Sequence, residues 1–156
     1  MKCDRATILR AVESSLDALA PTVARLTADS AISAEHALHV VVMDPARDAR
    51  APFEDAILVE RSFGDAEQWD ADYRGYARAK TRVSWRERRS LRMLLAKCPE
   101  RLRGDDIRVE GAVQSGGWIV GASGAQPWYD HAIATMAIEL FEAALAQARS
   151  GQDDSA

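Results

Sequence analysis

The sequence predicts a single α+β domain in which helices flank an antiparallel sheet. Two long segments have apolar residues every three or four positions, and four short apolar segments come in two adjacent pairs. Adjacent short strands favour hairpins, whereas regular alternation of strand and helix would favour a Rossmann-type parallel sheet. We therefore assign residues 1–150 to one domain, and residues 151–156 to a disordered tail.

The first element is a helix over residues 4–28, with Asp4 as its N-cap. Its apolar side chains fall on one stripe, as expected for a helix that covers a core. Pro21 interrupts this pattern and predicts either a kink or two helices in sequence. The stripe comprises Ile8, Leu9, Val12, Leu16, Leu19, Val23 and Leu26.

Two strands follow, over residues 37–43 and 56–63, each rich in β-branched or other apolar residues. The loop between them, residues 44–55, is rich in proline, aspartate and arginine. Alternation along the first strand puts His39 on the same face as Val41 and Met43.

Residues 66–97 predict one or two helices, with Gly75 or the Ser84-Trp85 step as the joint. A loop over residues 98–106 comes next. Short apolar runs at 107–113 and 118–122 then flank a Ser-Gly-Gly turn, which predicts an antiparallel hairpin.

The last helix is predicted to begin near Pro127, a residue favoured at the first helical position, and to end at Gly151. Glycine and other small residues at 121–124 connect the preceding strand to it. Such a turn either serves only as a tight corner or offers helix-start amides to a carboxylate or phosphate. Asp130, in the first helical turn, is itself able to accept from those amides.

The net charge is −4, but the charged residues are unevenly distributed along the chain. Residues 74–103 contain 11 basic and 2 acidic residues, a balance of +9, whereas both flanking segments are acidic. A row of arginines at every fourth position is either a solvated face, paired with acids such as Asp70 and Glu87, or a surface that binds an anion. We expect no nucleic-acid partner, because the rest of the chain would repel phosphates. The row comprises Arg74, Arg78, Arg82 and Arg86.

Other features of the sequence exclude several classes of protein. Cys3 and Cys98 are expected to be unpaired thiols of a reducing compartment, and two cysteines with three histidines make no standard metal pattern. No run is long and apolar enough to span a membrane, and acidic residues interrupt the N-terminal apolar pattern. We therefore expect a cytoplasmic protein with neither a membrane partner nor a bound metal.

Residues 119–130, IVGASGAQPWYD, resemble the GlcG/HbpS-like family, which includes the C-terminal domain of PduO-type proteins. The family pattern is an apolar strand, a Gly-x-Ser-Gly step and an acidic residue at the start of the final helix, matched here by Gly121, Ser123, Gly124 and Asp130. Residues 76–81, YARAKT, resemble the Lys-Ala-x-Thr region of the family's central helix, with Lys80 as the lysine.

This resemblance implies a profilin-like α/β/α sandwich, self-association into homo-oligomers and a small-molecule ligand, with haem as one candidate cofactor. The ligand pocket would lie between the final-helix turn and the central basic helix. Arginine side chains and turn amides would contact the ligand's carboxylates, and His131 would be an axial ligand if haem is bound. The candidate ligand-binding residues are Arg78, Lys80, Arg82, Gly121, Ser123, Gly124, Asp130 and His131.

Two other functions are compatible with the same residues. A small lyase or isomerase would use Lys80 or His131 as a base on a carboxylate substrate. A regulatory or structural module would serve only for association, through exposed aromatic residues such as Trp128 and Tyr129. The alternative to a ligand or catalytic role is that Lys80 and His131 are solvated surface residues, which the sequence favours. No sequence motif identifies a catalytic set.

Overall fold

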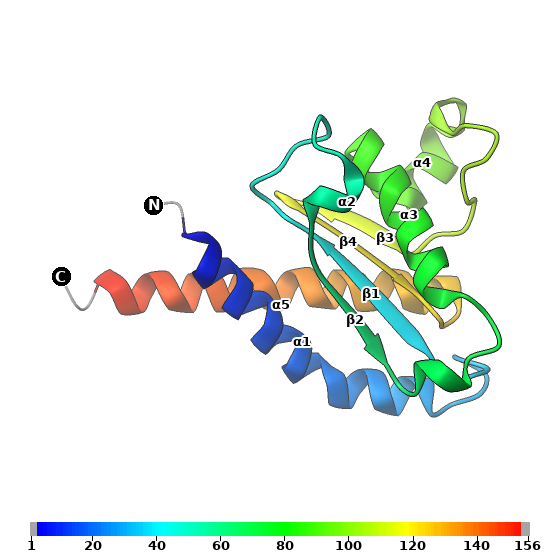
Figure 1. Ribbon diagram of the computed structural model, residues 1–156, viewed down its shortest axis with the longest axis horizontal. Helices are drawn as coiled ribbons and strands as arrows, with labels where there is room; N and C mark the ends of the chain where they lie inside the picture. Colours follow the sequence, from blue (N-terminus) through cyan, green and yellow to red (C-terminus); the bar gives the residue numbers. More distant parts are fainter. Residues whose placement is uncertain (1–2, 154–156) are drawn as a thin grey trace.

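The computed structural model describes residues 3–153 and has an α+β fold, in which helices cover both faces of a four-stranded antiparallel sheet (Figure 1). The sheet order is β2-β1-β4-β3, so two hairpins meet through β1 and β4. The elements are α1 (Arg5–Thr27), β1 (Leu38–Met43), α2 (Phe53–Ala56), β2 (Ile57–Phe63), η1 (Ala66–Gln68), α3 (Tyr73–Glu87), α4 (Leu91–Lys97), η2 (Pro99–Arg101), β3 (Ala112–Ser115), β4 (Trp118–Ser123) and α5 (Pro127–Asp153).

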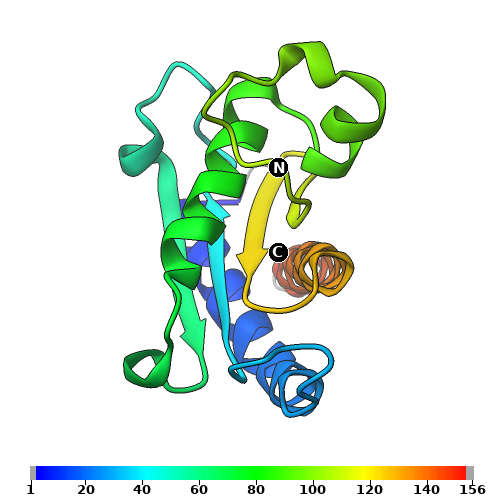
Figure 2. The ribbon, with the colours of Figure 1, turned by 90° about the vertical axis from the view of Figure 1, so that its right-hand side faces the viewer.

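Helices α1 and α5 pack together on one face of the sheet, and α3 lies on the other (Figure 2). Side-chain alternation along β1 divides the core between these layers. Leu38, Val40 and Val42 belong to the α1–α5 cluster, whereas Val41 and Met43 pack with residues of α2 and α3. The sequence prediction of helices on both sides of an antiparallel sheet is therefore confirmed.

Helix α1 is continuous, so the alternative of two helices divided at Pro21 is wrong. Pro21 lies on the exposed side, where the carbonyl that loses its helical partner can bond to water, while Leu19 and Val23 stay buried on the core side. The predicted cap is confirmed, because the Thr7 amide donates to Asp4 Oδ1 over 2.7 Å.

Neither predicted joint divides the central helical segment. Gly75 lies in the first turn of α3, where its amide donates to Asp72, and Ser84-Trp85 lies within the helix. Helix α3 instead ends at Glu87, because the next residue, Arg88, has a φ of 53° in the left-handed region. The Arg88 guanidinium lies 4.5 Å above the Trp85 ring, a contact that accompanies this turn without any glycine signal in the sequence.

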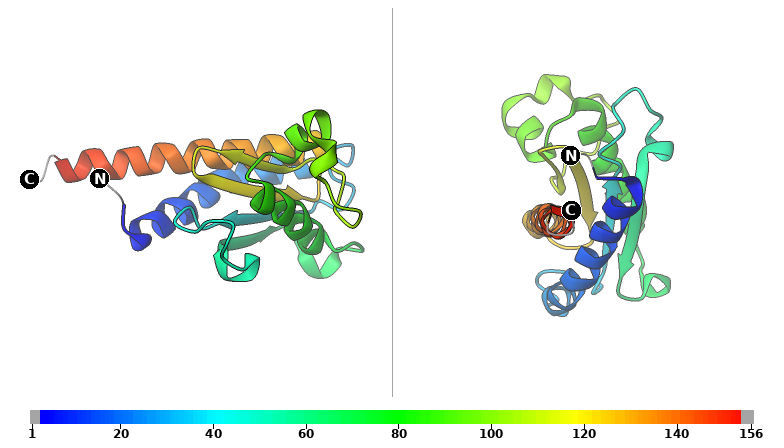
Figure 3. Two further views of the ribbon diagram at one scale, coloured as in Figure 1. Left: turned by 90° about the horizontal axis from the view of Figure 1, so that it is seen from above. Right: turned by 90° about the vertical axis from the view of Figure 1, so that its left-hand side faces the viewer.

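Two other predicted boundaries are wrong. Strand β3 begins only at Ala112, because residues 107–111 form a loop in which Gly111 takes a φ of 141°. Helix α5 continues through Gly151 to Asp153, while residues 154–156 of the predicted tail lie outside the described residues. Figure 3 shows that α5 extends beyond the sheet, toward the end of the molecule where α1 begins. Cys3 and Cys98 are free thiols, as predicted.

Candidate functional site

A pocket of about 250 Å³ lies between α3, the 107–111 loop and the turn from β4 to α5. Its polar lining comes from Lys80, Ser123 and Asp130, which belong to three different elements. Tyr73 and Tyr76 add two aromatic rings from the first turns of α3, and apolar side chains of the loop and the turn complete the lining. The pocket therefore occupies the place where the sequence predicted one, between the central helix and the final-helix turn.

Lys80 and Asp130 form a buried ion pair in this lining. Lys80 Nζ donates to Asp130 Oδ2 over 2.9 Å and to the Ala122 carbonyl over 3.3 Å. The two residues are 2% and 1% exposed. Since α3 and α5 cover opposite faces of the sheet, the pair joins the two helical layers around the end of β4. A buried pair of this kind is costly to break from one side, because the other charge is left without a partner.

Asp130 also satisfies the turn in front of its own helix. Its Oδ1 accepts from the Ala125 amide over 2.9 Å, so this helical carboxylate reaches back to an amide before the helix, as the acidic residue of a capping box does. Burial raises the pKa of Asp130 to about 6, an effect that the neighbouring Lys80 ammonium and the turn amides partly oppose. The anion next to these turn amides is thus the protein's own carboxylate, which favours the structural interpretation of the glycine turn.

Both glycines of the turn are required by close packing. Gly124 has a φ of 137°, and a Cβ there would lie 2.3 Å from the Ala37 carbonyl oxygen. A Cβ on Gly121 would lie 1.8 Å from Thr81 Oγ1, so this residue lets α3 approach β4 closely. Gly124 lines the pocket, whereas Gly121 lies beneath α3 and does not.

Several hydrogen-bonding groups of the pocket have no protein partner among residues 3–153. An ammonium has three N–H donors, of which Lys80 uses two. The hydroxyl groups of Tyr73, Tyr76 and Ser123 have no hydrogen-bond partner within the same described range. These groups are donors or can act as donors, so the pocket suits a ligand that is rich in acceptor oxygens.

The outer edge of the pocket is apolar and open to solvent. Tyr76 is 48% exposed and Val109 is 39% exposed, and both line the pocket. Tyr73 packs edge-on against Trp69 and Tyr76, with ring centroids 5.7 and 6.3 Å apart. A ligand would therefore meet polar groups at the inner end and aromatic or aliphatic side chains at the outer end.

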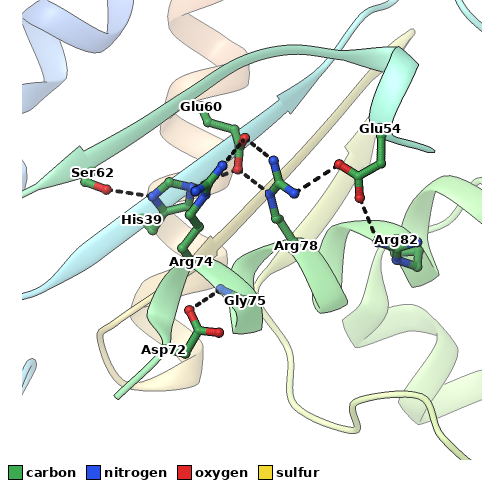
Figure 4. Close-up of polar contacts among 9 residues, drawn as sticks. All are labelled: His39, Glu54, Glu60, Ser62, Asp72, Arg74, Gly75, Arg78 and Arg82. Carbon is green, nitrogen blue, oxygen red and sulfur yellow. Dashed lines mark hydrogen bonds and ion pairs between the residues drawn. The ribbon is translucent and has the colours of Figure 1, made fainter. Parts of the chain in front are cut away.

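The predicted arginines lie elsewhere. Figure 4 shows Arg78 between Glu60 of β2 and Glu54 of α2, with Arg74 and Arg82 on either side along α3. Arg78 donates to Glu60 through Nε over 2.7 Å and through a terminal nitrogen over 2.5 Å, a bidentate pair. Neither Arg78 nor Arg82 lines the pocket, and their guanidinium groups are paired within the protein.

Two histidines that the sequence analysis considered also lie outside the pocket lining. His39 is buried in β1, where its ring nitrogens contact Ser62 Oγ at 2.8 Å and Glu60 Oε1 at 3.1 Å (Figure 4). His131 lies in the first turn of α5, and its Nδ1 is buried without a partner among the described residues. Burial lowers the pKa of both rings below the usual value, since the charged form is poorly solvated there.

The Glu60–Arg78 contact leads to a pH-dependent prediction. Hydrogen bonds from Arg78 lower the pKa of Glu60 from 4.5 to about 2. The stabilisation is therefore present above pH 4.5 and is lost as the pH falls toward 2. We expect Glu60→Gln to lower the free energy of unfolding by about 2 kcal/mol at pH 7, as measured by urea denaturation.

The exposed Glu67 provides the matched control, and Glu67→Gln should change the unfolding free energy by less than about 0.5 kcal/mol. The difference in unfolding free energy between the wild type and Glu60→Gln should become smaller as the pH falls from 4.5 to 2. A deficit that stays constant over this range would show that Glu60 does not act through its charge.

The structure thus brings together four of the eight candidate residues, namely Lys80, Ser123, Gly124 and Asp130. Tyr73 and Tyr76 line the same pocket but are not among the eight candidates. Tyr76 and Tyr73 precede Lys80 by four and seven residues, a helical-face spacing that could have identified them. The contribution of loop 107–111 had no such signal, because that segment was expected to be a strand.

In the described part of the chain, no group of three or more histidine, cysteine, aspartate or glutamate side chains is arranged to hold a metal ion. Between residues 3 and 153, no helix combines the length and apolar character needed to cross a bilayer.

A scan against protein-family models finds none that matches the chain, and a search of curated proteins also finds no match. The resemblance of residues 119–130 to the GlcG/HbpS-like family therefore stays a prediction.

Proposed function

We propose that the protein binds a small, acceptor-rich molecule with an apolar part, most simply a carboxylic acid, in the pocket between α3 and the β4–α5 turn. The observation that carries this proposal is the Lys80 ammonium, which is buried in the pocket lining with one N–H donor unpaired by residues 3–153. The hydroxyl groups of Tyr73 and Ser123 supply further donors, and Ile107 and Val109 face the apolar part of the ligand.

The size of the pocket limits the ligand. Drug-sized molecules occupy clefts of roughly 300–1,000 Å³, whereas this pocket measures about 250 Å³. Haem is too large for a pocket of this volume. In addition, His131, the expected axial ligand of haem, lies outside the pocket lining. The residues present do not fit haem, so we propose a smaller ligand.

The resemblance to the GlcG/HbpS-like family supports a binding function, because that family is a scaffold for small-molecule recognition. It also leads us to propose a cytoplasmic protein that forms homo-oligomers. Trp128 follows the lining residue Pro127 in the chain and is 57% exposed, and an exposed tryptophan is a frequent contact at subunit interfaces. A purely associative role would leave the third N–H donor of the buried Lys80 ammonium without a use, so we rank it below ligand binding.

An acid–base enzyme is the second candidate. Lys80 lines the pocket beside a carboxylate at 2.9 Å, an arrangement that could move a proton. In the structure, however, Lys80 makes the contacts of a charged donor, to Asp130 and Ala122, rather than those of a resting base. His131 does not line the pocket. Binding is therefore the function that the geometry supports best.

Isothermal titration calorimetry with acetate, pyruvate, lactate and benzoate tests the proposal. We expect at least one of these acids to bind, and Ser123→Ala and Tyr73→Phe each to weaken that binding about tenfold or more, the effect of losing a hydrogen bond to a charged group. Tyr129→Phe is the matched control, because Tyr129 is also partly buried but lies outside the pocket lining.

The proposal is wrong if none of the four acids binds. It is also wrong if the control Tyr129→Phe weakens binding as much as the two pocket variants do. Circular dichroism of each variant establishes that the comparison is made between folded proteins.

A further inference from the structure

The nitrogen of Lys80 is a primary amine in a pocket, and primary amines react with carbonyl compounds as well as binding them. Such a reaction requires a nearby group that takes up and returns protons. Asp130 Oδ2 lies 2.9 Å from Nζ, within the reach needed for this transfer. The same carboxylate is buried, so water does not compete for its proton.

We propose that Lys80 forms an imine with a small carbonyl acid bound in this pocket, a 2-oxo acid being the class that fits. The inference rests on the proposed binding function and identifies the ligand class more closely. The carboxylate of a 2-oxo acid would accept from the hydroxyl groups of Ser123 and Tyr73, which have no partner within residues 3–153. Its carbonyl carbon would then lie next to Nζ of Lys80.

The reaction balances with the groups present. The ammonium passes a proton to Asp130, the nitrogen lone pair attacks the carbonyl carbon, and the C=O electron pair moves to oxygen, which takes that proton back. A second proton then travels from nitrogen through Asp130 to the hydroxyl, which leaves as water while the nitrogen lone pair forms the C=N bond. An ammonium and a ketone thus give an iminium and one water, with the charge unchanged.

Asp130 serves this sequence in two ways. Burial raises its pKa to about 6, so it holds a transferred proton better than an exposed aspartate would. The iminium product keeps one positive charge, so the charge pairing that holds α3 to α5 persists in the adduct. Imine formation at this site therefore replaces one cation with another and leaves no buried charge without a partner.

The test is reductive trapping of the wild-type protein. The protein is incubated with pyruvate and sodium cyanoborohydride, which reduces iminium ions, and peptide mass spectrometry then locates the adduct. The chain has only three lysines, Lys2, Lys80 and Lys97, so assignment is direct. We expect Lys80 to be modified at least about tenfold faster than the exposed Lys97, because binding holds the carbonyl beside the amine.

A matched variant separates pocket chemistry from general amine reactivity. Ser123→Ala keeps the Lys80–Asp130 pair intact, and we expect it to slow labelling at Lys80 about tenfold while labelling at Lys97 stays unchanged. Lys80→Arg should abolish the adduct at position 80. Labelling of wild-type protein that is no faster at Lys80 than at Lys97 overturns the proposal, whatever the stability of the variants.

Lactate distinguishes this inference from the proposed function, since it has a hydroxyl where pyruvate has the carbonyl. If both acids bind by calorimetry but pyruvate leaves no adduct on Lys80, imine formation is excluded and the binding function stands. If none of the four acids binds and no adduct forms, both proposals are wrong, whereas binding of acetate or benzoate alone without an adduct overturns only the imine. Saturable labelling of Lys80 that lactate competes away supports both.

Discussion

Replacing Lys80 with methionine lowers the free energy of unfolding by about 3–5 kcal/mol at pH 7, the largest effect that we expect from a single polar side chain in this protein. Methionine keeps much of the volume but removes the donor, so Asp130 stays buried with its charge unpaired. Urea denaturation followed by tryptophan fluorescence measures the loss. Lys97→Met, on the exposed side of α4, should change the unfolding free energy by less than about 0.5 kcal/mol.

Two further measurements test the mechanism of this loss. The double variant Lys80→Met, Asp130→Asn should be more stable than Lys80→Met alone, because it removes the unpaired charge. The loss in unfolding free energy of Lys80→Met relative to the wild type should also become smaller at low pH. Burial raises the pKa of Asp130 and Lys80 partly opposes this rise in the wild type, so removing Lys80 should raise the folded-state pKa further. As the pH falls, protonation of Asp130 therefore favours folding of the variant more than folding of the wild type. A deficit that is the same at pH 5 and pH 8 would point to lost packing instead.

Gly124→Ala is the second large effect, with an expected loss of about 3 kcal/mol or more in the free energy of unfolding. The backbone at Gly124 has a φ of 137°, and an added Cβ would lie 2.3 Å from the Ala37 carbonyl oxygen and 2.8 Å from the Leu38 Cα. Both neighbours are main-chain atoms at the start of β1, so no side chain can rotate to relieve the contact.

The control is Gly104→Ala, because a Cβ at Gly104 meets no atom within 4 Å. That change should be neutral or stabilise the protein by up to about 1 kcal/mol, through the smaller entropy of the unfolded chain. Thermal and urea denaturation of the two variants give the comparison. If Gly104→Ala and Gly124→Ala have equal stabilities, the tight junction between β4 and α5 is not what requires glycine.

Periodicity was sufficient to predict the elements that form the sheet and its α1–α5 layer. Helix α1 and strands β1 and β4 lie where their apolar patterns placed them, because burial of one face decides these segments. The wrongly predicted boundaries depend on backbone conformation rather than on apolar periodicity. Arg88 adopts left-handed backbone without glycine, and residues 107–111 become a loop because Gly111 turns toward Ala122 and Lys80.

Most of the candidate residues that line the pocket lie in one short motif, the connection from β4 to α5. Ser123, Gly124 and Asp130 lie together because a short strand-to-helix connection keeps them together. Of the alternatives for the arginine row, pairing with acids is the one observed. Arg86 contacts Glu87, as predicted. Arg78 and Arg82, however, are paired with Glu54 and Glu60, which the spacing did not identify. Those partners come from α2 and β2, so only the tertiary fold brings them within reach of α3.

The Lys80–Asp130 pair, which joins α3 to α5 around the end of β4, also constrains how this protein can diverge. A change at either position alone leaves a buried charge and costs several kcal/mol, so it would be removed by selection before it could alter ligand preference. Descendants that recognise a different ligand should therefore have exchanged residues 80 and 130 together. Covariation between these two positions is the evolutionary record that this contact should leave.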